Sequence, residues 1–426
     1  MNFTERDKNN IWHPFTQQKT ADAPIHIESA KGSVLFSSDG KKYIDAISSW
    51  WVNIHGHGNE YIANKIAEQA KKLEHVVFAG FTHTPAIELA ERLIQILPTE
   101  FSKVFYSDNG STSVEVAIKM ALQYWYNQGI TNKTKILAFE NAYHGDTFGA
   151  MSVGGKSAFN KPFHQHLFEV IHLPLPTGNN LEALKIRIQE LSNQDTIAAF
   201  IFEPLIQGAG GMIMYEAEYL DELLSVAKQN DIICIADEVM TGFGRTGNTF
   251  AIDYLQNQPD IICLSKGITG GFMPFGVTVC SQNIYDSFYS DDKQKTFFHG
   301  HSYTANPLSC VAANASLDLL LAEKCINEIK RISKSHSDFV NEIKDDASIK
   351  NIRHLGTIIA FEIDTSEDTS YFNSISNKVY NFFIERGVLL RPLGNVIYIM
   401  PPYCITTDEL NAVYMVIKEF LIYIKK

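Results

Sequence analysis

The sequence predicts an α/β protein, with a large domain in which helices cover both faces of a mostly parallel sheet and a smaller α+β domain. Through the middle of the chain, near-continuous apolar runs alternate with helical patterns, which is typical of strands buried on both faces. The C-terminal third is more charged and combines helical patterns with shorter apolar runs. A length of 426 residues, 45% of them hydrophobic, is sufficient for both domains.

The elements of the large domain follow one another along the chain. Residues 112–128 carry apolar side chains every three or four positions, which predicts a helix, and Thr112 with Glu115 has the spacing of a capping box at its start. A second helix is expected over residues 220–230. Strands are expected at 103–108, 135–140, 196–204, 231–239, 260–265 and 275–280.

We expect the chain to divide into three regions. The large domain would span residues 56–315 and the small domain residues 316–426. Residues 1–55 contain a strand pair and would pack with the small domain. In the small domain, helices are expected near 317–345 and 371–386, and strands at 356–363 and 395–402.

Charge and apolar content argue against nucleic acid and membranes as partners. The net charge is −12, from 36 basic and 48 acidic residues, which disfavours binding to either anionic surface. The start of the chain is polar and lacks the apolar core of a signal peptide, and no apolar run approaches the ~20 residues of a membrane helix. We therefore expect a cytoplasmic protein.

The cysteines and histidines do not form a pattern typical of a metal site. None of the six cysteines belongs to a C-x-x-C pair. Cys234, Cys263 and Cys280 lie in apolar runs, so we expect buried free thiols in a reducing compartment. Three H-x-H pairs occur without an H-E-x-x-H motif or a Cys/His spacing, and we expect no metal. These pairs are His55/His57, His164/His166 and His299/His301.

Polar residues stand where strands of the predicted sheet end, which is where open α/β sheets bind ligands. Gly110 and Ser111 lie between a strand and a helix start, as in an anion site or in an ordinary capped loop. Asp237 ends one apolar run, and Lys266 ends the next, before a glycine-rich loop. The two could form a structural ion pair. Alternatively, Asp237 could cap a helix, bind a metal or hold a cationic nitrogen, and Lys266 could clamp a substrate or form a Schiff base.

The combination of these residues is more specific than any one of them, because in this order they fit pyridoxal phosphate. The phosphate needs a helix N-terminus, the ring needs an aromatic face such as Tyr143, the ring nitrogen needs a carboxylate, and the aldehyde needs a lysine. No Walker motif, and no G-x-G-x-x-G after a strand, supports a nucleotide instead.

The stretches ADEVMTGFGRTG (236–247) and LSKGITGG (264–271) resemble the signature of class III aminotransferases, which are fold-type I pyridoxal-phosphate enzymes. The resemblance extends over essentially the whole chain, and includes SSWWVNIHGHGN (48–59), HGHSYTANPL (299–308) and RPLGNVIYIMPPY (391–403). It implies a homodimer with active sites at the interface and two small-molecule substrates, an amino donor and a keto acid.

The resemblance also implies a role for each matched residue. Lys266 would bind the cofactor covalently and carry the proton transfer, Asp237 would pair with the ring nitrogen, and Tyr143 would stack on the ring. The residues implied to hold the cofactor are Gly110, Ser111, Tyr143, Asp237, Val239 and Lys266, with His301 and Ser302 from the other subunit. Those implied to contact substrate are Phe15, Trp50, Trp51, Tyr143, Asp146, Arg245, Gly300 and Arg391.

Arg391 would bind the carboxylate of the keto acid through a bidentate fork. Glu203 could pair with Arg391 when no carboxylate is bound, and Arg245 and Asp146 would help to recognise the amino donor. Phe15 stands where some members have a tyrosine, which leaves the donor open. The scaffold also serves transaminases of ornithine, 4-aminobutyrate or diamines, as well as mutases and decarboxylases.

The stretch 299–308 contains two further differences from some members of the family. His301 replaces a proline and Ser302 replaces a threonine of some members.

Overall fold

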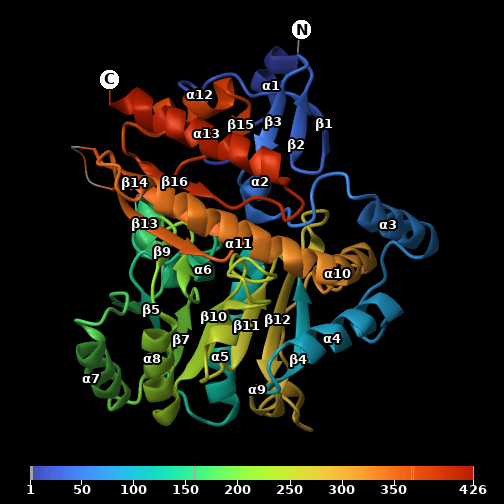
Figure 1. The fold of residues 1–426 in the computed structure, drawn as a ribbon. Coiled ribbons are helices and arrows are strands. Elements are labelled where there is room, and N and C mark those ends of the chain that lie inside the picture. Colours follow the sequence, from blue (N-terminus) through green and yellow to red (C-terminus); the bar gives the residue numbers. More distant parts are fainter. Residues whose placement is uncertain (1–2, 158, 366, 368, 426) are drawn as a thin grey trace.

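The computed structural model describes residues 3–157, 159–365, 367 and 369–425. Its centre is a seven-stranded sheet in the order β4-β12-β11-β10-β7-β5-β6 (Figure 1). Neighbouring strands are parallel except β12, which runs antiparallel to β11 and β4. The mostly parallel sheet predicted from the apolar runs is therefore confirmed. Its strands are β4 (Phe101–Ser107), β5 (Lys135–Phe139), β6 (Val170–Leu173), β7 (Ile197–Phe202), β10 (Ile233–Asp237), β11 (Ile261–Leu264) and β12 (Gly276–Ser281).

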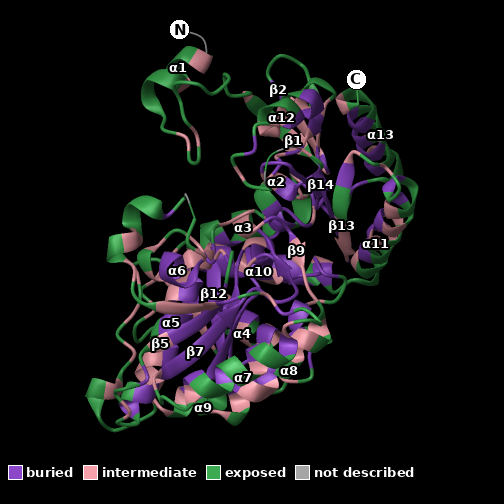
Figure 2. Ribbon diagram, turned by 90° about the vertical axis from the view of Figure 1, so that its left-hand side faces the viewer, coloured by how far each residue is buried: buried purple, intermediate pink, exposed green. Residues whose placement is uncertain are grey.

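Helices cover both faces of this sheet, because alternate residues of each buried strand supply apolar side chains to two separate cores. Ile201 and Ile235 face the core shared with α5 and α6, whereas Phe200 and Phe202 face the core shared with α7 and α8. Figure 2 shows α5 on one side of the strands and α4, α7 and α8 on the other. The helices around the sheet are α4 (Thr84–Ile96), α5 (Gly110–Asn127), α6 (Phe148–Val153), α7 (Leu181–Ser192), α8 (Ala217–Gln229), α9 (Gln282–Asp286) and α10 (Pro307–Leu320).

The remaining strands form three smaller sheets, in the orders β1-β2-β3-β15, β13-β14-β16 and β8-β9. The first sheet joins the two ends of the chain, because Ile44 of β3 pairs in parallel with Val388 of β15. These strands are β1 (Ile27–Lys31), β2 (Val34–Ser37), β3 (Lys42–Asp45), β8 (Ile206–Gln207), β9 (Ile213–Met214), β13 (Ile349–Leu355), β14 (Ile358–Ile363), β15 (Val388–Leu389) and β16 (Val396–Ile399). The domain boundaries at residues 55 and 315 stay predictions.

Helices from both ends of the chain surround these smaller sheets. α11 packs on β13 and β14, and α12 packs on β15 and α13. α1 has no buried side chain and stands away from the body of the molecule (Figure 2). The helices outside the main sheet are α1 (Phe3–Asn10), α2 (Ser48–Trp51), α3 (Glu60–Lys72), α11 (Glu323–Ile343), α12 (Ser376–Glu385) and α13 (Thr407–Ile424). Short 3-10 helices lie at η1 (Lys161–His166), η2 (Ala251–Tyr254), η3 (Lys266–Thr269) and η4 (Lys293–Lys295).

The start of α5 differs from the predicted capping box. The N-cap is Asn109, whose side chain accepts from the backbone N–H of Thr112, while Thr112 Oγ1 accepts from the N–H of Asn109. Glu115 lies one turn further on, and its carboxylate accepts from the N–H groups of Gly149 and Ala150 in α6. The prediction of a Thr112–Glu115 box was wrong because the helix begins two residues earlier, at Gly110.

The cysteines and the helix lengths can be compared with the predictions from the sequence. All six cysteines are free, and Cys234, Cys263 and Cys280 are buried, as predicted. Within the part of the chain that the structure describes, no helix combines the length and hydrophobicity needed to cross a bilayer.

Candidate active site

A titratable side chain lies at or just beyond the carboxyl end of each of three neighbouring parallel strands. Glu203 follows β7, Asp237 ends β10 and Lys266 follows β11. The strand ladder aligns these ends, because Ala236 pairs with Phe202 on one side and Asp237 pairs with Cys263 on the other. The sheet thus brings together residues that are far apart in the sequence.

Lys266 lies at the wall of a cavity of about 450 Å³. Its Nζ is 4.8 Å from the ring centroid of Trp51, and it forms no ion pair with any residue that the structure describes. Burial lowers the pKa of Lys266, and the charges of Asp237 and Glu203 only partly oppose this shift. The alternative of a structural Lys266–Asp237 ion pair is therefore not what the structure contains, and the amine is kept available as a nucleophile.

Asp237 instead pairs with a histidine. Its Oδ2 lies 2.7 Å from His144 Nδ1, and its Oδ1 accepts from the backbone N–H of Val239. Burial alone would lower the pKa of His144, but the hydrogen bond and the charge of Asp237 outweigh it and raise that pKa. His144 Nε2 is buried without a partner among the described residues. This histidine was missed at the sequence level, although its place beside Tyr143 in a strand-end loop could have indicated it.

Glu203 is buried, and both of its carboxylate oxygens accept from backbone N–H groups, those of Tyr143 and Gly208, each at 2.9 Å. Burial raises the pKa of Glu203 to about 7, and the neighbouring charge of His144 opposes the shift. The predicted pairing of Glu203 with Arg391 was wrong, because the carboxylate is already used to hold the loop that carries Tyr143.

The N-terminus of α5 also lines the cavity. The backbone of Gly110 comes close to a neighbouring side chain, and an added Cβ would lie 2.7 Å from Val239 Cγ1. Ser111 Oγ accepts from the N–H of Asp146 at 2.8 Å. Free N–H groups at a helix start, with a hydroxyl beside them, make a suitable site for a phosphate.

Tyr143 is a further residue that lines this cavity. Its hydroxyl donates to Asp146 Oδ2 at 2.9 Å, and burial raises its pKa, so the phenol stays protonated. Glu203, Asp237 and Lys266 line the cavity together with Tyr143 and Val239. We call these five residues, with Gly110 and Ser111, the cofactor wall. This cavity therefore combines an acid, an amine, an aromatic ring and a helix N-terminus. These groups fit a flat, anionic cofactor that carries an aldehyde.

Trp50 and Trp51 are presented by a left-handed turn. The residues assigned to α2 all have positive φ: Ser48 at 52°, Ser49 at 45°, Trp50 at 69° and Trp51 at 76°. For residues other than glycine this conformation costs roughly 1–2 kcal/mol each. Four in succession require strong support from the surroundings.

The turn directs the two indoles to different places. Trp51 is buried, with Nε1 donating to the hydroxyl of Tyr398 at 3.0 Å, and its ring faces Lys266. Trp50 is exposed and its ring lies 5.5 Å from Phe15 and 4.9 Å from the guanidinium carbon of Arg391. We call Phe15, Trp50, Trp51 and Arg391 the substrate wall.

Arg391 is the cation of this substrate wall. Its guanidinium makes no ion pair or hydrogen bond with any residue in the described part of the chain. An arginine held against an aromatic ring without a partner carboxylate is suited to bind one from a ligand.

Of the substrate wall, only Trp51 lines the cavity around Lys266, and Phe15, Trp50 and Arg391 lie outside it, as does Asp146. Other predicted site residues also lie outside this cavity. Arg245 is fully buried, and its guanidinium donates to the backbone carbonyls of Pro401 and Trp51. Gly300 and Ser302 are exposed and His301 is half-buried, in the loop before α10. In the described part of the chain, no group of three or more His, Cys, Asp and Glu residues could hold a metal ion.

Comparisons with known proteins place this geometry in a family. The family model for class-III aminotransferases matches residues 15–421. The adenosylmethionine-8-amino-7-oxononanoate aminotransferase of Synechococcus elongatus is 48% identical over 420 residues, which cover 97% of this chain and 98% of that protein. The crystal structure of the aminotransferase of the same name from Methanocaldococcus jannaschii superposes with a TM-score of 0.93 at 37% identity, covering 98% of each chain. A PLP-bound amine transaminase from an uncultivated Pseudomonas species gives 0.88 at 31% identity, covering 96% of this chain and 97% of that one. The chain belongs to the class-III aminotransferase family.

Proposed function

We propose that this protein is a pyridoxal-phosphate-dependent transaminase that converts 8-amino-7-oxononanoate to 7,8-diaminononanoate in biotin biosynthesis. The observation that carries the proposal is the amine of Lys266, which forms no ion pair with any described residue, faces the ring of Trp51 and lines one cavity with the buried carboxylate of Asp237. The relatives and the solved structure described above bear the name of this reaction.

The residues of the cofactor wall would hold pyridoxal phosphate by complementary chemistry. Gly110 and Ser111 would bind the phosphate at the N-terminus of α5, and Tyr143 and Val239 would enclose the ring. Asp237, supported by His144, would keep a proton on the ring nitrogen. The bound cofactor supplies an electron-withdrawing ring that stabilises negative charge on the substrate carbon during amino transfer.

Lys266 would move the proton of the reaction. Because burial lowers the pKa of its amine, a larger fraction is neutral near neutral pH and can act as a base. The amine would take the proton from the substrate carbon that bears the nitrogen and would deliver it to the carbon on the other side of that nitrogen, which belongs to the cofactor. Trp51, packed over this amine, would exclude water from that side.

The substrate wall would bind the keto acid. A nine-carbon chain is apolar along most of its length and carries a carboxylate at one end. Trp50 and Phe15 would cover the chain, and Arg391 would bind the carboxylate. One cavity would serve both half-reactions in a ping-pong cycle, with the donor leaving before the keto acid enters.

We further propose a homodimer whose active sites include Gly300, His301 and Ser302 across the interface. In a single chain these residues do not line the cavity around Lys266, and the loop that holds them is largely exposed. Large apolar side chains are exposed near this loop and on the N-terminal segment, as on surfaces that become buried on assembly. They include Trp12, Val77, Phe81, Phe298 and Tyr303.

The amino donor is proposed to be S-adenosyl-L-methionine, and the alternative is lysine, since Phe15 lacks the hydroxyl found in some members. Assays of 7,8-diaminononanoate formation with each donor separately would decide between them. Arg245 and Asp146 would contribute to donor recognition, Arg245 through the backbone that it holds. We place the reaction in the cytoplasm, in keeping with the free buried cysteines.

The experiment that tests the function is a visible absorbance spectrum of the purified protein, before and after addition of 7,8-diaminononanoate. We expect the cofactor band to move to shorter wavelength while 8-amino-7-oxononanoate appears, as measured by mass spectrometry. If the cofactor band is present but does not move, the protein binds pyridoxal phosphate, and the proposal that 7,8-diaminononanoate is its product is refuted. A protein without a cofactor band after incubation with pyridoxal phosphate would refute the whole proposal.

A further inference from the structure

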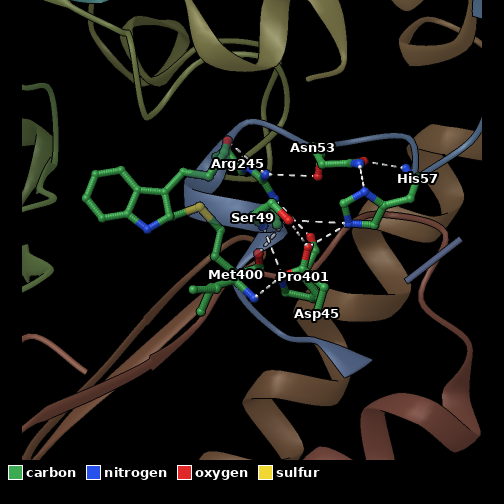
Figure 3. A network of polar contacts seen from close by, with 11 residues as sticks. Asp45, Ser49, Asn53, His57, Arg245, Met400 and Pro401 are labelled. Carbon is green, nitrogen blue, oxygen red and sulfur yellow. Dashed lines mark hydrogen bonds and ion pairs between the residues drawn. The ribbon is translucent and has the colours of Figure 1, made fainter. Parts of the chain in front are cut away.

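The left-handed turn that carries Trp50 and Trp51 is held by a buried carboxylate. Asp45, at the end of β3, has no exposed side-chain surface. Its Oδ1 accepts from the backbone N–H of Ser49 at 2.9 Å, and its Oδ2 accepts from Ser49 Oγ at 2.8 Å. Both oxygens of Asp45 therefore bond to Ser49, the second of the residues with positive φ (Figure 3).

His57 completes the bonding of this carboxylate. Its Nε2 lies 2.8 Å from Asp45 Oδ2, and its Nδ1 lies 3.0 Å from Asn53 Nδ2. The orientation of the Asn53 amide is fixed, because its Oδ1 accepts from the N–H of Gly56. Nδ1 must then accept, so the imidazole is the neutral form that donates from Nε2 to Asp45. Figure 3 shows this chain of contacts from Asp45 through His57 to Asn53.

The same turn is held on its other side by residues far away in the sequence. Arg245 donates to the carbonyls of Trp51 and Asn53, and Ser48 Oγ donates to the carbonyl of Met400. Within the described part of the chain, the side-chain acceptor for the backbone N–H of Ser49 is Asp45, and His57 in turn bonds to Asp45. A buried carboxylate without its donors is expensive, so the pair acts as a unit.

The backbone of His57 is held independently of its side chain. Its N–H and carbonyl pair with Gly32, at 2.7 and 3.0 Å. A change of the imidazole therefore leaves the local chain path supported. The mechanism described above does not use the imidazole or Asp45, and neither lines the cavity around Lys266.

We propose that Asp45 and His57 are positioning residues that hold the strained Ser48–Trp51 turn, and thereby fix Trp51 over Lys266 and Trp50 against Arg391. The kinetic part of this inference rests on the proposed function. The structural part does not, because it concerns only the conformation of the turn.

The first test measures hydrogen–deuterium exchange of the backbone amides of residues 47–53 in the protein with its cofactor bound. In His57→Phe we expect exchange in this segment to rise roughly tenfold, the effect of losing one hydrogen bond to a buried charge. His57→Gln keeps a donor near the position of Nε2 and should restore most of the protection. His172→Phe is the matched control, since His172 is likewise a half-buried histidine whose Nε2 bonds to an oxygen, in this case the backbone carbonyl of Gly154.

The outcomes of this test are distinct. Unchanged exchange over residues 47–53 in His57→Phe would overturn the proposal, as would an equal rise in β7 and β10, because the histidine would then support the whole fold. If His57→Phe does not fold, Asp45→Asn provides the same test. The asparagine has the shape of the aspartate, but its NH₂ group cannot accept a hydrogen bond and would face one of the donors that now bond to Asp45.

The second test separates binding from chemistry. In His57→Phe we expect KM for 8-amino-7-oxononanoate to rise about tenfold more than in His57→Gln. Combining His57→Phe with Trp50→Ala should add little to the KM of Trp50→Ala alone, because both changes act through the same indole. Fully additive effects would refute the link to the tryptophan. If the wild-type protein has no activity on this substrate, the proposed function fails, and hydrogen exchange still decides the role of the pair.

Discussion

Lys266 and Trp51 face each other across 4.8 Å, from amine to ring centroid, but the regions that carry them are built differently. The cofactor wall stands at the ends of parallel strands, where the ladder between β10 and β11 fixes the separation of Asp237 and Lys266. The substrate wall depends on a left-handed turn held by the nearby carboxylate of Asp45 and by two distant groups, the guanidinium of Arg245 and the backbone carbonyl of Met400.

Under the proposed function, this difference would separate the roles of the two walls. Groups that move protons must keep fixed positions, and the aligned strand ends supply them, with Lys266 (φ 46°) as the one residue of this wall that has a positive φ outside glycine. A wall that recognises one particular substrate can be altered without disturbing the sheet. We therefore expect substitutions in the cofactor wall to lower kcat, and substitutions in the substrate wall to raise KM.

The largest expected effect is that of Lys266→Ala, which should lower turnover by roughly 10³-fold or more, because no other amine lines the cavity among the described residues. Steady-state assays with the keto acid and a donor measure it. The thermal unfolding midpoint should not fall, since this amine forms no ion pair with other described residues. Turnover within tenfold of the wild type would show that the lysine does not carry the chemistry.

Arg391→Ala should have an effect of intermediate size, and the effect should be on KM rather than on kcat. A lost bidentate bond to a carboxylate should raise KM for the keto acid by about 10- to 100-fold, with a small change in kcat. Arg386→Ala is the control, because Arg386 also lies against an aromatic ring, that of Phe382, but pairs with Glu419 on the surface. Equal effects of the two changes on KM would contradict the assignment of the substrate wall.

The cofactor wall could largely be predicted from the sequence. Asp237 and Lys266 each end an apolar run, and the pattern of a parallel sheet brings such ends to one edge. The sequence did not predict that Asp237 pairs with His144, because a histidine in a loop gives no signal of its partner. It also misplaced Glu203, whose bonds to two backbone N–H groups depend on how the loop after β5 folds back.

The substrate wall could be predicted only through the family resemblance. No local pattern in Ser48–Trp51 indicates positive φ, since serine and tryptophan do not favour that conformation. The turn exists because Asp45, His57, Arg245 and Met400 hold it, and these contacts join residues that are up to 352 positions apart. Sequence reasoning therefore named these side chains as candidates, and that assignment stays a prediction, but it did not indicate how they are presented.

The smallest expected effect on catalysis, and one that is measured on stability instead, concerns Glu203, the buried acid of the cofactor wall. Glu203 has a pKa raised to about 7 by burial, against an ordinary value of 4.5. Between these two values the folded protein keeps a proton that the unfolded chain has lost. The free energy of unfolding therefore falls as pH rises through this interval, by at most about 3 kcal/mol, and the effect is absent at lower pH.

Glu203→Gln should flatten this pH dependence, because an amide does not titrate. The measurement is the thermal unfolding midpoint of cofactor-free protein at about pH 5 and about pH 8, where the wild type should lose more stability than the variant. Some dependence should remain, since burial also raises the pKa of Glu238 to about 7. The exposed Glu218→Gln on α8 removes the same charge and should leave the slope unchanged. If Glu203→Gln and Glu218→Gln have the same slope, Glu203 ionises normally and the cofactor wall rests on a charged carboxylate rather than on a protonated one.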